Sequence, residues 1–313
     1  MHFGNDCVFM LLKKKADYRT IYMYRLKKKE ALRRTESEFF LTHRQTTKIT
    51  GKTVEQMQQE LTEKRNSVSA SLLKTTAAVL MFINHFSVGL FWNGILDISS
   101  WYYEFQWYLT RASFVLYAFL IAEGMVHTGN RNKYILRLLA MAIASEFFYD
   151  ELLLGGFPYW GGQNVFFTLF FGALAISIID RFKAKPLIPV ATTALILTVS
   201  AVLRADYGIM GVSIILLFYY LRGNKSVMLV SVAAAVFVLW FVQRGILCAM
   251  AGRPFAIADY MHGGLQEMHG ILAYPLITLY NGKRGKQLPK LFYYLFYPGH
   301  LLAILMFVRL ISA

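Results

Sequence analysis

Long apolar stretches recur along the chain after a charged N-terminal segment. Most of them are about 15–22 residues long, enough for a helix that rises 1.5 Å per residue to cross a bilayer core. Helices are the expected elements, because backbone polar groups in lipid must be satisfied within their own segment. The pattern therefore predicts an all-α, polytopic transmembrane bundle of about nine helices. The predicted spans are residues 72–94, 110–128, 134–149, 164–180, 187–203, 208–221, 227–243, 264–280 and 291–311.

Charge divides the chain into two parts. Residues 1–66 hold 15 of the 33 Lys and Arg and 8 of the 18 Asp and Glu. The remaining 247 residues hold only 28 charged side chains, too few to solvate a soluble globule of that size. We predict a basic, partly helical or disordered cytoplasmic tail over residues 1–70 and a transmembrane domain over residues 71–313. The lipid bilayer is the expected partner of the second part.

The net charge of +15 does not indicate nucleic acid. About half of it lies in the N-terminal segment, and most of the rest lies in short loops between apolar runs. Cytoplasmic loops of membrane proteins concentrate Lys and Arg in this way. The rule predicts a protein of the cytoplasmic membrane with its N-terminus inside and, for nine spans, its C-terminus outside. The basic loop residues are Arg131, Lys133, Arg181, Lys183, Lys185, Arg222, Lys225, Lys283, Arg284, Lys286 and Lys290.

Two histidines lie inside predicted spans. His85 is eleven residues past Lys74, and His300 is ten residues past Lys290. Both are therefore expected about 15–16 Å from the cytoplasmic end, near the bilayer midplane. Imidazole titrates near neutrality, so either residue can act as general base or nucleophile in a shared cavity. The alternative is two separate hydrogen bonds between helices.

Glu146 and Asp150 are four residues apart near the end of the third predicted span. Like charges at that spacing repel unless they share a proton or cation, or are neutralised by a residue such as Arg111 or Arg204. A structural ion pair is one interpretation and a functional site is the other. No histidine stands at ligand spacing beside them, so we predict no metal site.

Glu123 and His127 are also four residues apart, and they fit either a local hydrogen-bonded pair or a catalytic one. The chain has two cysteines and no CxxC, and it lacks a Gly-rich phosphate loop, a GxSxG elbow and an HExxH motif. The usual soluble-enzyme classes therefore have no support in the sequence.

Short motifs follow one another in a fixed order across residues 72–311. They are LLKT (72–75), INH (83–85), RASF (111–114), FLIAEG (119–124), HT (127–128), NKY (132–134), RL (137–138), ASE (144–146), NVFFT (164–168), ADYG (205–208), Gly211, NGKRG (281–285), LF (291–292), FYP (296–298) and HL (300–301). In this order and spacing they resemble the TraX family of polytopic membrane proteins, whose namesake acetylates the N-terminus of F-type conjugative pilin. The chain departs from the family pattern at Asn84, where the family has Asp, and in residues 1–70, which have no counterpart.

The resemblance implies an acetyltransferase or other acyltransferase that uses acetyl-CoA as acyl donor. Basic residues of one predicted cytoplasmic loop, Lys283, Arg284 and Lys286, can attract the phosphates of the donor. The acceptor is expected to be an amine or hydroxyl of a surface protein, such as a pilin in conjugation, or of a cell-envelope glycan.

The same resemblance implies roles for four residues. His85 or His300 takes a proton from the acceptor. Arg111 or a neighbouring donor stabilises the oxyanion, and an acid such as Glu146 orients a histidine.

A different class of protein fits part of the pattern. In a transporter, or in a non-catalytic membrane protein of pilus or envelope assembly, the two histidines would line a path through the bundle. Coupled transport often leaves several acids within the spans, and Glu123 and Glu146 are the obvious ones here. This scarcity of acids favours the enzyme. The pattern does not indicate an oligomeric state.

Overall fold

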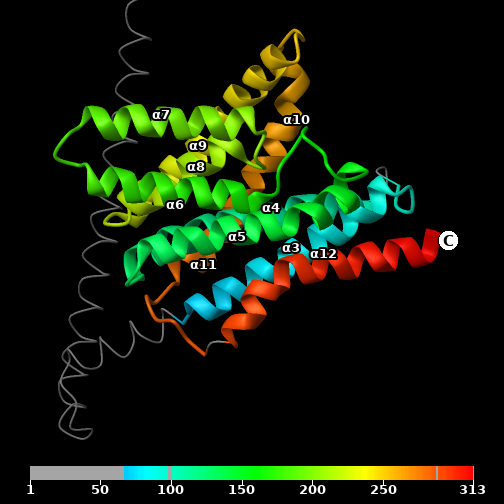
Figure 1. The fold of residues 1–313 in the computed structure, drawn as a ribbon, viewed down its shortest axis with the longest axis horizontal. Coiled ribbons are helices and arrows are strands. Elements are labelled where there is room, and N and C mark those ends of the chain that lie inside the picture. The colour runs from blue at the N-terminus through cyan, green and yellow to red at the C-terminus, as the bar shows by residue number, and fades with distance from the viewer. Residues whose placement is uncertain (1–66, 98–100, 287, 313) are drawn as a thin grey trace, which may run out of the picture. The chain divides into compact units, whose positions relative to one another are not determined.

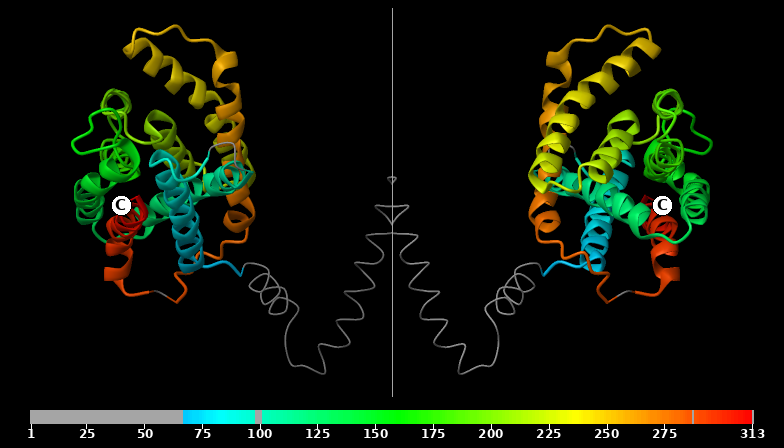
Figure 2. Two further views of the ribbon diagram at one scale, coloured as in Figure 1. Left: turned by 90° about the vertical axis from the view of Figure 1, so that its right-hand side faces the viewer. Right: turned by 90° about the vertical axis from the view of Figure 1, so that its left-hand side faces the viewer.

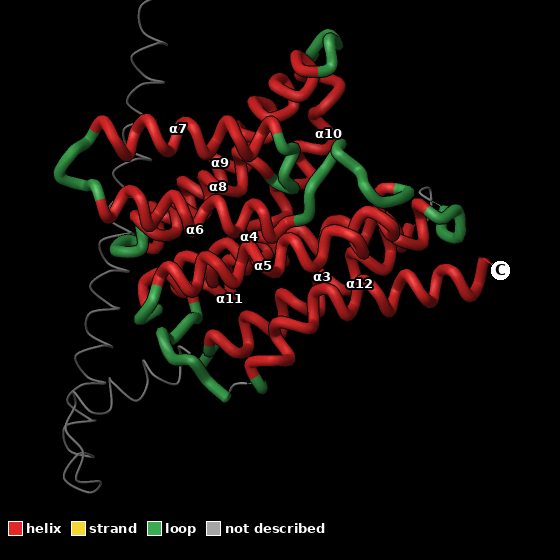
Figure 3. Tube along the Cα trace, viewed as in Figure 1, coloured by secondary structure: helices red, strands yellow, loops and turns green. Residues whose placement is uncertain are grey.

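The computed structural model describes residues 67–97, 101–286 and 288–312, which are coloured in Figure 1. Within these ranges the chain folds into helices and loops without a strand, as Figure 3 shows. The predicted all-α class is therefore confirmed. The predicted tail falls on residues 1–70, almost all of which lie outside the described residues, so it stays a prediction.

Eight of the nine predicted runs each correspond to one α-helix in the described residues. These helices are α3 (Ala70–Trp92), α4 (Trp101–His127), α5 (Arg131–Tyr149), α6 (Val165–Arg181), α7 (Leu187–Val202), α8 (Gly208–Tyr220), α9 (Lys225–Met250) and α12 (Lys290–Ser312). Helix α4 begins nine residues earlier than predicted. The prediction missed its first turns because they carry the polar residues Glu104 and Gln106 among aromatic ones. Hydropathy alone excludes such a segment.

The prediction of a single helix over residues 264–280 is wrong. This stretch contains the end of α10 (Ile257–Met268), a 3₁₀ segment over His269–Ala273 and the short helix α11 (Tyr274–Thr278). Pro275 explains the break, because proline lacks a backbone N–H and its ring clashes with the carbonyl four residues earlier in a continuous α-helix.

Four described helices are long and apolar enough to cross a membrane: α3, α4, α9 and the Leu295–Ser312 part of α12. Helices α7 and α8 are apolar but shorter, at 16 and 13 residues. Thirteen residues rise only about 20 Å, less than the roughly 30 Å of a bilayer core. The chain therefore has the helices of a membrane protein, with spans of unequal length.

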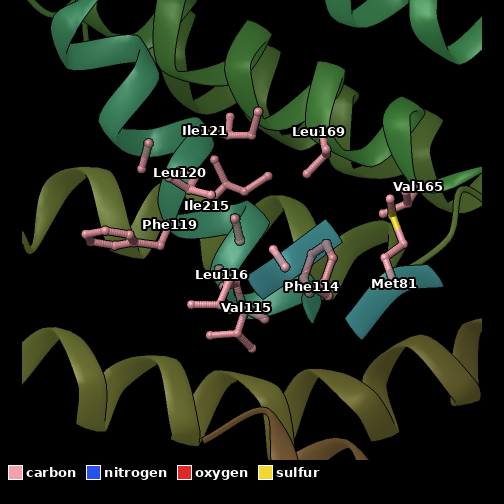
Figure 4. Packing of buried hydrophobic residues seen from close by; sticks show 14 of the residues in the cluster. Met81, Phe114, Val115, Leu116, Phe119, Leu120, Ile121, Val165, Leu169 and Ile215 are labelled. Carbon is pink, nitrogen blue, oxygen red and sulfur yellow. The ribbon is translucent and has the colours of Figure 1, made fainter. Parts of the chain in front are cut away.

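Helix α4 lies at the centre of the bundle. It packs against α3, α6 and α8 and is largely buried, whereas α3, α9 and α12 expose much of their apolar surface. Figure 4 shows side chains of α4 meeting those of Met81, Val165, Leu169 and Ile215. Exposed apolar helices around a buried one are expected where lipid, rather than water, covers the outside.

Helices α3 and α12 begin at the same end of the bundle. The N–H groups of Ala70 and Ser71 donate to the carbonyls of Lys283 (2.9 Å) and Arg284 (3.0 Å), in the loop before α12. The two helices then lie side by side, as Figures 1 and 2 show in cyan and red.

Candidate functional site

His85 of α3 and His300 of α12 meet inside the bundle. His85 Nδ1 lies 2.7 Å from His300 Nε2, and the two rings are nearly parallel, with centroids 5.1 Å apart. Only 7% of His85 and 6% of His300 is exposed. The structure therefore brings the two predicted histidines into contact, and they form one hydrogen bond between α3 and α12 rather than two separate ones.

The hydrogen-bond partners define which nitrogens carry protons in the neutral pair. His300 Nδ1 lies 2.7 Å from the carbonyl oxygen of Phe296, which can only accept, so Nδ1 carries the hydrogen. Nε2 of neutral His300 then accepts a hydrogen bond from Nδ1–H of His85. No described residue forms a hydrogen bond with His85 Nε2, so its lone pair is free within this part of the chain. This order makes His85 the base of the pair.

Aromatic side chains fix the orientation of the two imidazoles. Tyr297 is buried and packs edge-on against His85 and His300, with ring centroids 5.7 and 5.3 Å away. Phe296 stacks on His300 at 4.9 Å. Rings held on two sides have little rotational freedom, so the order of hydrogen bonds along the pair is maintained.

A cavity of about 180 Å³ adjoins His85. It has room for a few ordered waters or an acetyl-sized group. Its wall comes from the second half of α3, the first half of α4, the end of α5 with the π-helical segment Asp150–Leu154, the start of α6, and the turn between α7 and α8. The polar residues on this wall are Asn84, His85, Thr110, Ser113, Arg111, Asp206, Tyr117, Tyr149 and Tyr207.

Arg111 brings a buried positive charge to the same cavity as His85. Its guanidinium lies over the Trp107 ring at 4.3 Å, and Nη1 donates to Glu267 Oε1 (3.0 Å) and to the Tyr207 hydroxyl (3.2 Å). Arg111 Nε is buried and has no hydrogen-bond partner among the described residues. A buried charge is costly unless it is paired, and Glu267 supplies that pairing.

Asn84, which stands where the resemblance leads us to expect Asp, also lies on the cavity wall. Its Nδ2 donates to Thr110 Oγ1 at 3.1 Å and so links α3 to α4. The difference between Asn and Asp therefore changes the charge of the cavity beside His85.

The acidic pair Glu146 and Asp150 and the pair Glu123 and His127 do not contact the two buried histidines. Glu146 Oε2 accepts from the backbone N–H of Asn164 (3.3 Å) and from its side-chain amide, and Asp150 accepts from a loop N–H. Within the described residues neither acid forms an ion pair with an arginine, and Glu146 does not hydrogen-bond a histidine. Glu123 and His127 form a local pair at 3.4 Å near the end of α4.

The basic loop lies toward the opposite end of α3 from the cavity. Lys283, Arg284 and Lys286 are exposed beside the start of α3, fifteen residues before His85. This separation is about 22 Å along the helix. The structure therefore does not bring these cations into the cavity.

A shallow apolar groove of about 440 Å³ follows α12 from the end of the basic loop toward the histidines. It is lined by Pro289, Phe292, Leu295, Phe296, Gly299 and His300. His300 lines this groove and His85 lines the cavity, so the pair is reached from two directions.

Several polar residues of the site escaped prediction, among them Asp206 and Tyr207 on the wall and Glu267 behind Arg111. Asp206 and Tyr207 belong to the ADYG motif. The turn that contains this motif has residues with positive φ, which the sequence does not reveal. Tyr207 has φ +61°, and Arg204 has φ +52°. Burial raises the pKa of Asp206 to about 6, against the lowering effect of Arg111.

These features define a helical membrane protein that buries a hydrogen-bonded histidine pair beside a charged cavity. The chain belongs to the TraX family, because the sequence profile described as TraX protein matches residues 69–309. It is 31% identical over 246 residues to a probable fimbrial assembly protein, FimC of serogroup H1, from Dichelobacter nodosus, covering 74% of this chain and 93% of that protein. No solved structure matches the chain.

Proposed function

We propose that this protein is a multi-pass acyltransferase of the cytoplasmic membrane that moves an acetyl group from acetyl-CoA to a protein of the cell surface. The observation that carries the proposal is the free lone pair of His85 Nε2 beside the cavity that holds Arg111. A fimbrial or pilin-like subunit is the acceptor that fits the name of the FimC relative. An envelope glycan is the second acceptor class.

The chemistry proceeds by addition and elimination. The acceptor nitrogen or oxygen attacks the thioester carbonyl while His85 Nε2 takes its proton, and the carbonyl oxygen becomes an oxyanion near Arg111. The C–S bond then breaks, and the proton on His85 passes to the departing sulfur. The products are the acetylated acceptor and free CoA. His300 stabilises the imidazolium of His85, because its Nε2 accepts the Nδ1–H bond more strongly when His85 is charged.

The two approaches to the histidine pair suggest separate entries for the two substrates. The basic loop attracts the phosphates of acetyl-CoA, and the groove along α12 leads from that loop to His300. The acceptor enters the cavity that lies beyond His85. With the N-terminus inside, as the positive-inside rule predicts, the donor comes from the cytoplasm and the acceptor from the other side.

The test uses the full chain in lipid vesicles with acetyl-CoA that carries a labelled acetyl group. The acceptor probes are a short peptide with one free α-amino group and maltose as a source of hydroxyl groups. We expect His85→Ala to lower the rate of label transfer at least about 100-fold, because a general base contributes 10²–10⁴-fold. His300→Ala should lower it less, because His85 keeps its free lone pair.

His127→Ala is the matched control, since this histidine is 57% exposed and lies outside the cavity. Its rate should equal that of the wild type. Full activity of both His85→Ala and His300→Ala would overturn the mechanism. Uptake of label into the vesicles without transfer to either probe would support the transporter class instead.

A further inference from the structure

Tyr207 occupies an unusual position in the turn before α8. Its φ of +61° lies in the left-handed region, where a bulky aromatic residue is rarely found. The ring stacks face-to-face on Phe114 of α4, with centroids 3.7 Å apart and an angle of 6°. A strained backbone that persists requires support from its surroundings, and such strain is concentrated at functional sites.

The neighbours of the turn supply this support. Thr168 Oγ1 donates to the carbonyl of Asp206, and Ala205 N–H donates to the carbonyl of Ser200 (3.0 Å). A Cβ at Gly211 would lie 2.8 Å from both Tyr207 Cβ and Phe114 Cζ, so only glycine leaves room for the stacked rings. The surroundings therefore hold the Tyr207 ring against α4 at the cavity wall.

The hydroxyl of Tyr207 has an unused donor. It accepts from Arg111 Nη1 at 3.2 Å, and its own proton makes no hydrogen bond to a described residue. A phenol that accepts from a guanidinium is polarised, and its O–H becomes a stronger donor. Burial raises the pKa of Tyr207 well above its usual value, so the hydroxyl keeps its proton.

We infer that the Tyr207 hydroxyl, backed by Arg111, donates the hydrogen bond that stabilises the oxyanion formed from the acyl carbonyl. The inference rests on the proposed acyl transfer and assigns a catalytic residue to it. Tyr207 and His85 line the same cavity, so one acetyl-sized group can contact the donor on one side while the base serves the attacking atom. Arg111 polarises this hydroxyl through Nη1, which donates to both Tyr207 and Glu267.

Tyr207→Phe tests this inference in the same vesicle assay. The variant keeps the aromatic ring and its stacking and removes one oxygen atom. We expect kcat to fall about 100-fold with KM within twofold of the wild type, since loss of one oxyanion donor lowers kcat by 10²–10³. Tyr274→Phe is the matched control: its hydroxyl donates to the carbonyl of Leu229 (2.7 Å) and does not line the cavity. Its kcat should be unchanged.

A second measurement separates catalysis from folding. In an Arg111→Gln background, Tyr207→Phe should lower kcat less than tenfold further, because the two residues act on one oxygen. The melting temperature of Tyr207→Phe in detergent should match that of the wild type. An unchanged kcat for Tyr207→Phe, with an active wild type, would overturn this inference alone. A wild type that transfers no label to either probe would overturn the acyltransferase proposal and this inference with it.

Discussion

The order of hydrogen bonds along the histidine pair depends on a single backbone carbonyl. Phe296 O fixes the proton on His300 Nδ1, and this proton determines which nitrogen of His85 is free. Because both histidines are neutral in this arrangement, the bundle buries a base without burying a net charge. The cost of desolvation falls on Arg111 and Glu267, which are paired.

Asn84 offers a test of the cavity charge. In Asn84→Asp a carboxylate would stand on the cavity wall next to His85 in sequence, where it stabilises the imidazolium that forms during proton transfer. We expect kcat to rise about tenfold, which corresponds to roughly 1.4 kcal/mol of transition-state stabilisation. The measurement is label transfer from acetyl-CoA to the peptide probe.

Asn84→Ala is the control, since it removes the bond to Thr110 without adding charge. If only that bond matters, Asn84→Asp and Asn84→Ala will show similar rates. Equal rates of label transfer in these two variants would show that a carboxylate at position 84 does not assist proton transfer to His85.

At the residue level, sequence spacing indicated a similar depth for His85 and His300, but it left open whether they meet and did not predict their surroundings. Distance along a helix gives an approximate depth, so the two similar lysine-to-histidine intervals indicated a similar level for the two imidazoles. The contacts of Tyr207 and Glu267 with Arg111 join residues 96 and 156 positions apart, and no local pattern encodes them. The positive φ of Tyr207 likewise follows from tertiary packing.

The helices were predicted well where they are long and uniformly apolar. Residues 264–280 are apolar enough to resemble a single span, but Pro275 interrupts the helix, since proline is a strong breaker of helices. Helix starts were less secure than helix centres, because the aromatic and polar first turns of α4 do not resemble the apolar run that follows.

Small residues allow the short helices to pack closely. A Cβ at Gly172 of α6 would lie 2.5 Å from Cδ1 and 3.0 Å from Cβ of Ile215 on α8. Gly172→Ala should therefore destabilise the bundle by about 1–3 kcal/mol, the usual cost of overpacking. The measurement is thermal unfolding of the detergent-solubilised protein.

Gly223→Ala is the matched control, because no atom of the described residues lies within 4 Å of a Cβ at that position. Its melting temperature should equal that of the wild type. A Gly172→Ala variant as stable as Gly223→Ala would show that α6 and α8 can separate without cost.

The broken eighth run still returns the chain to the end where α3 begins. Val68 N–H donates to the carbonyl of Leu279 (3.2 Å), and Lys225 Nζ, at the start of α9, donates to the carbonyl of Thr278 (3.0 Å). Helix α12 therefore runs away from this end. The loop contacts, rather than a continuous helix, therefore set the position of residues 278–283.

This arrangement predicts the labelling of single cysteines in intact cells. In a chain with both natural cysteines replaced by serine, Lys286→Cys marks the end with the basic loop and Ser312→Cys marks the opposite end. With the basic loop inside, a membrane-impermeant thiol reagent should label Ser312→Cys and should label Lys286→Cys only after permeabilisation. The reverse pattern would place the loop outside and exclude cytoplasmic acetyl-CoA from the groove along α12. Labelling of both positions in intact cells would mean that the bundle does not span the membrane in the predicted order.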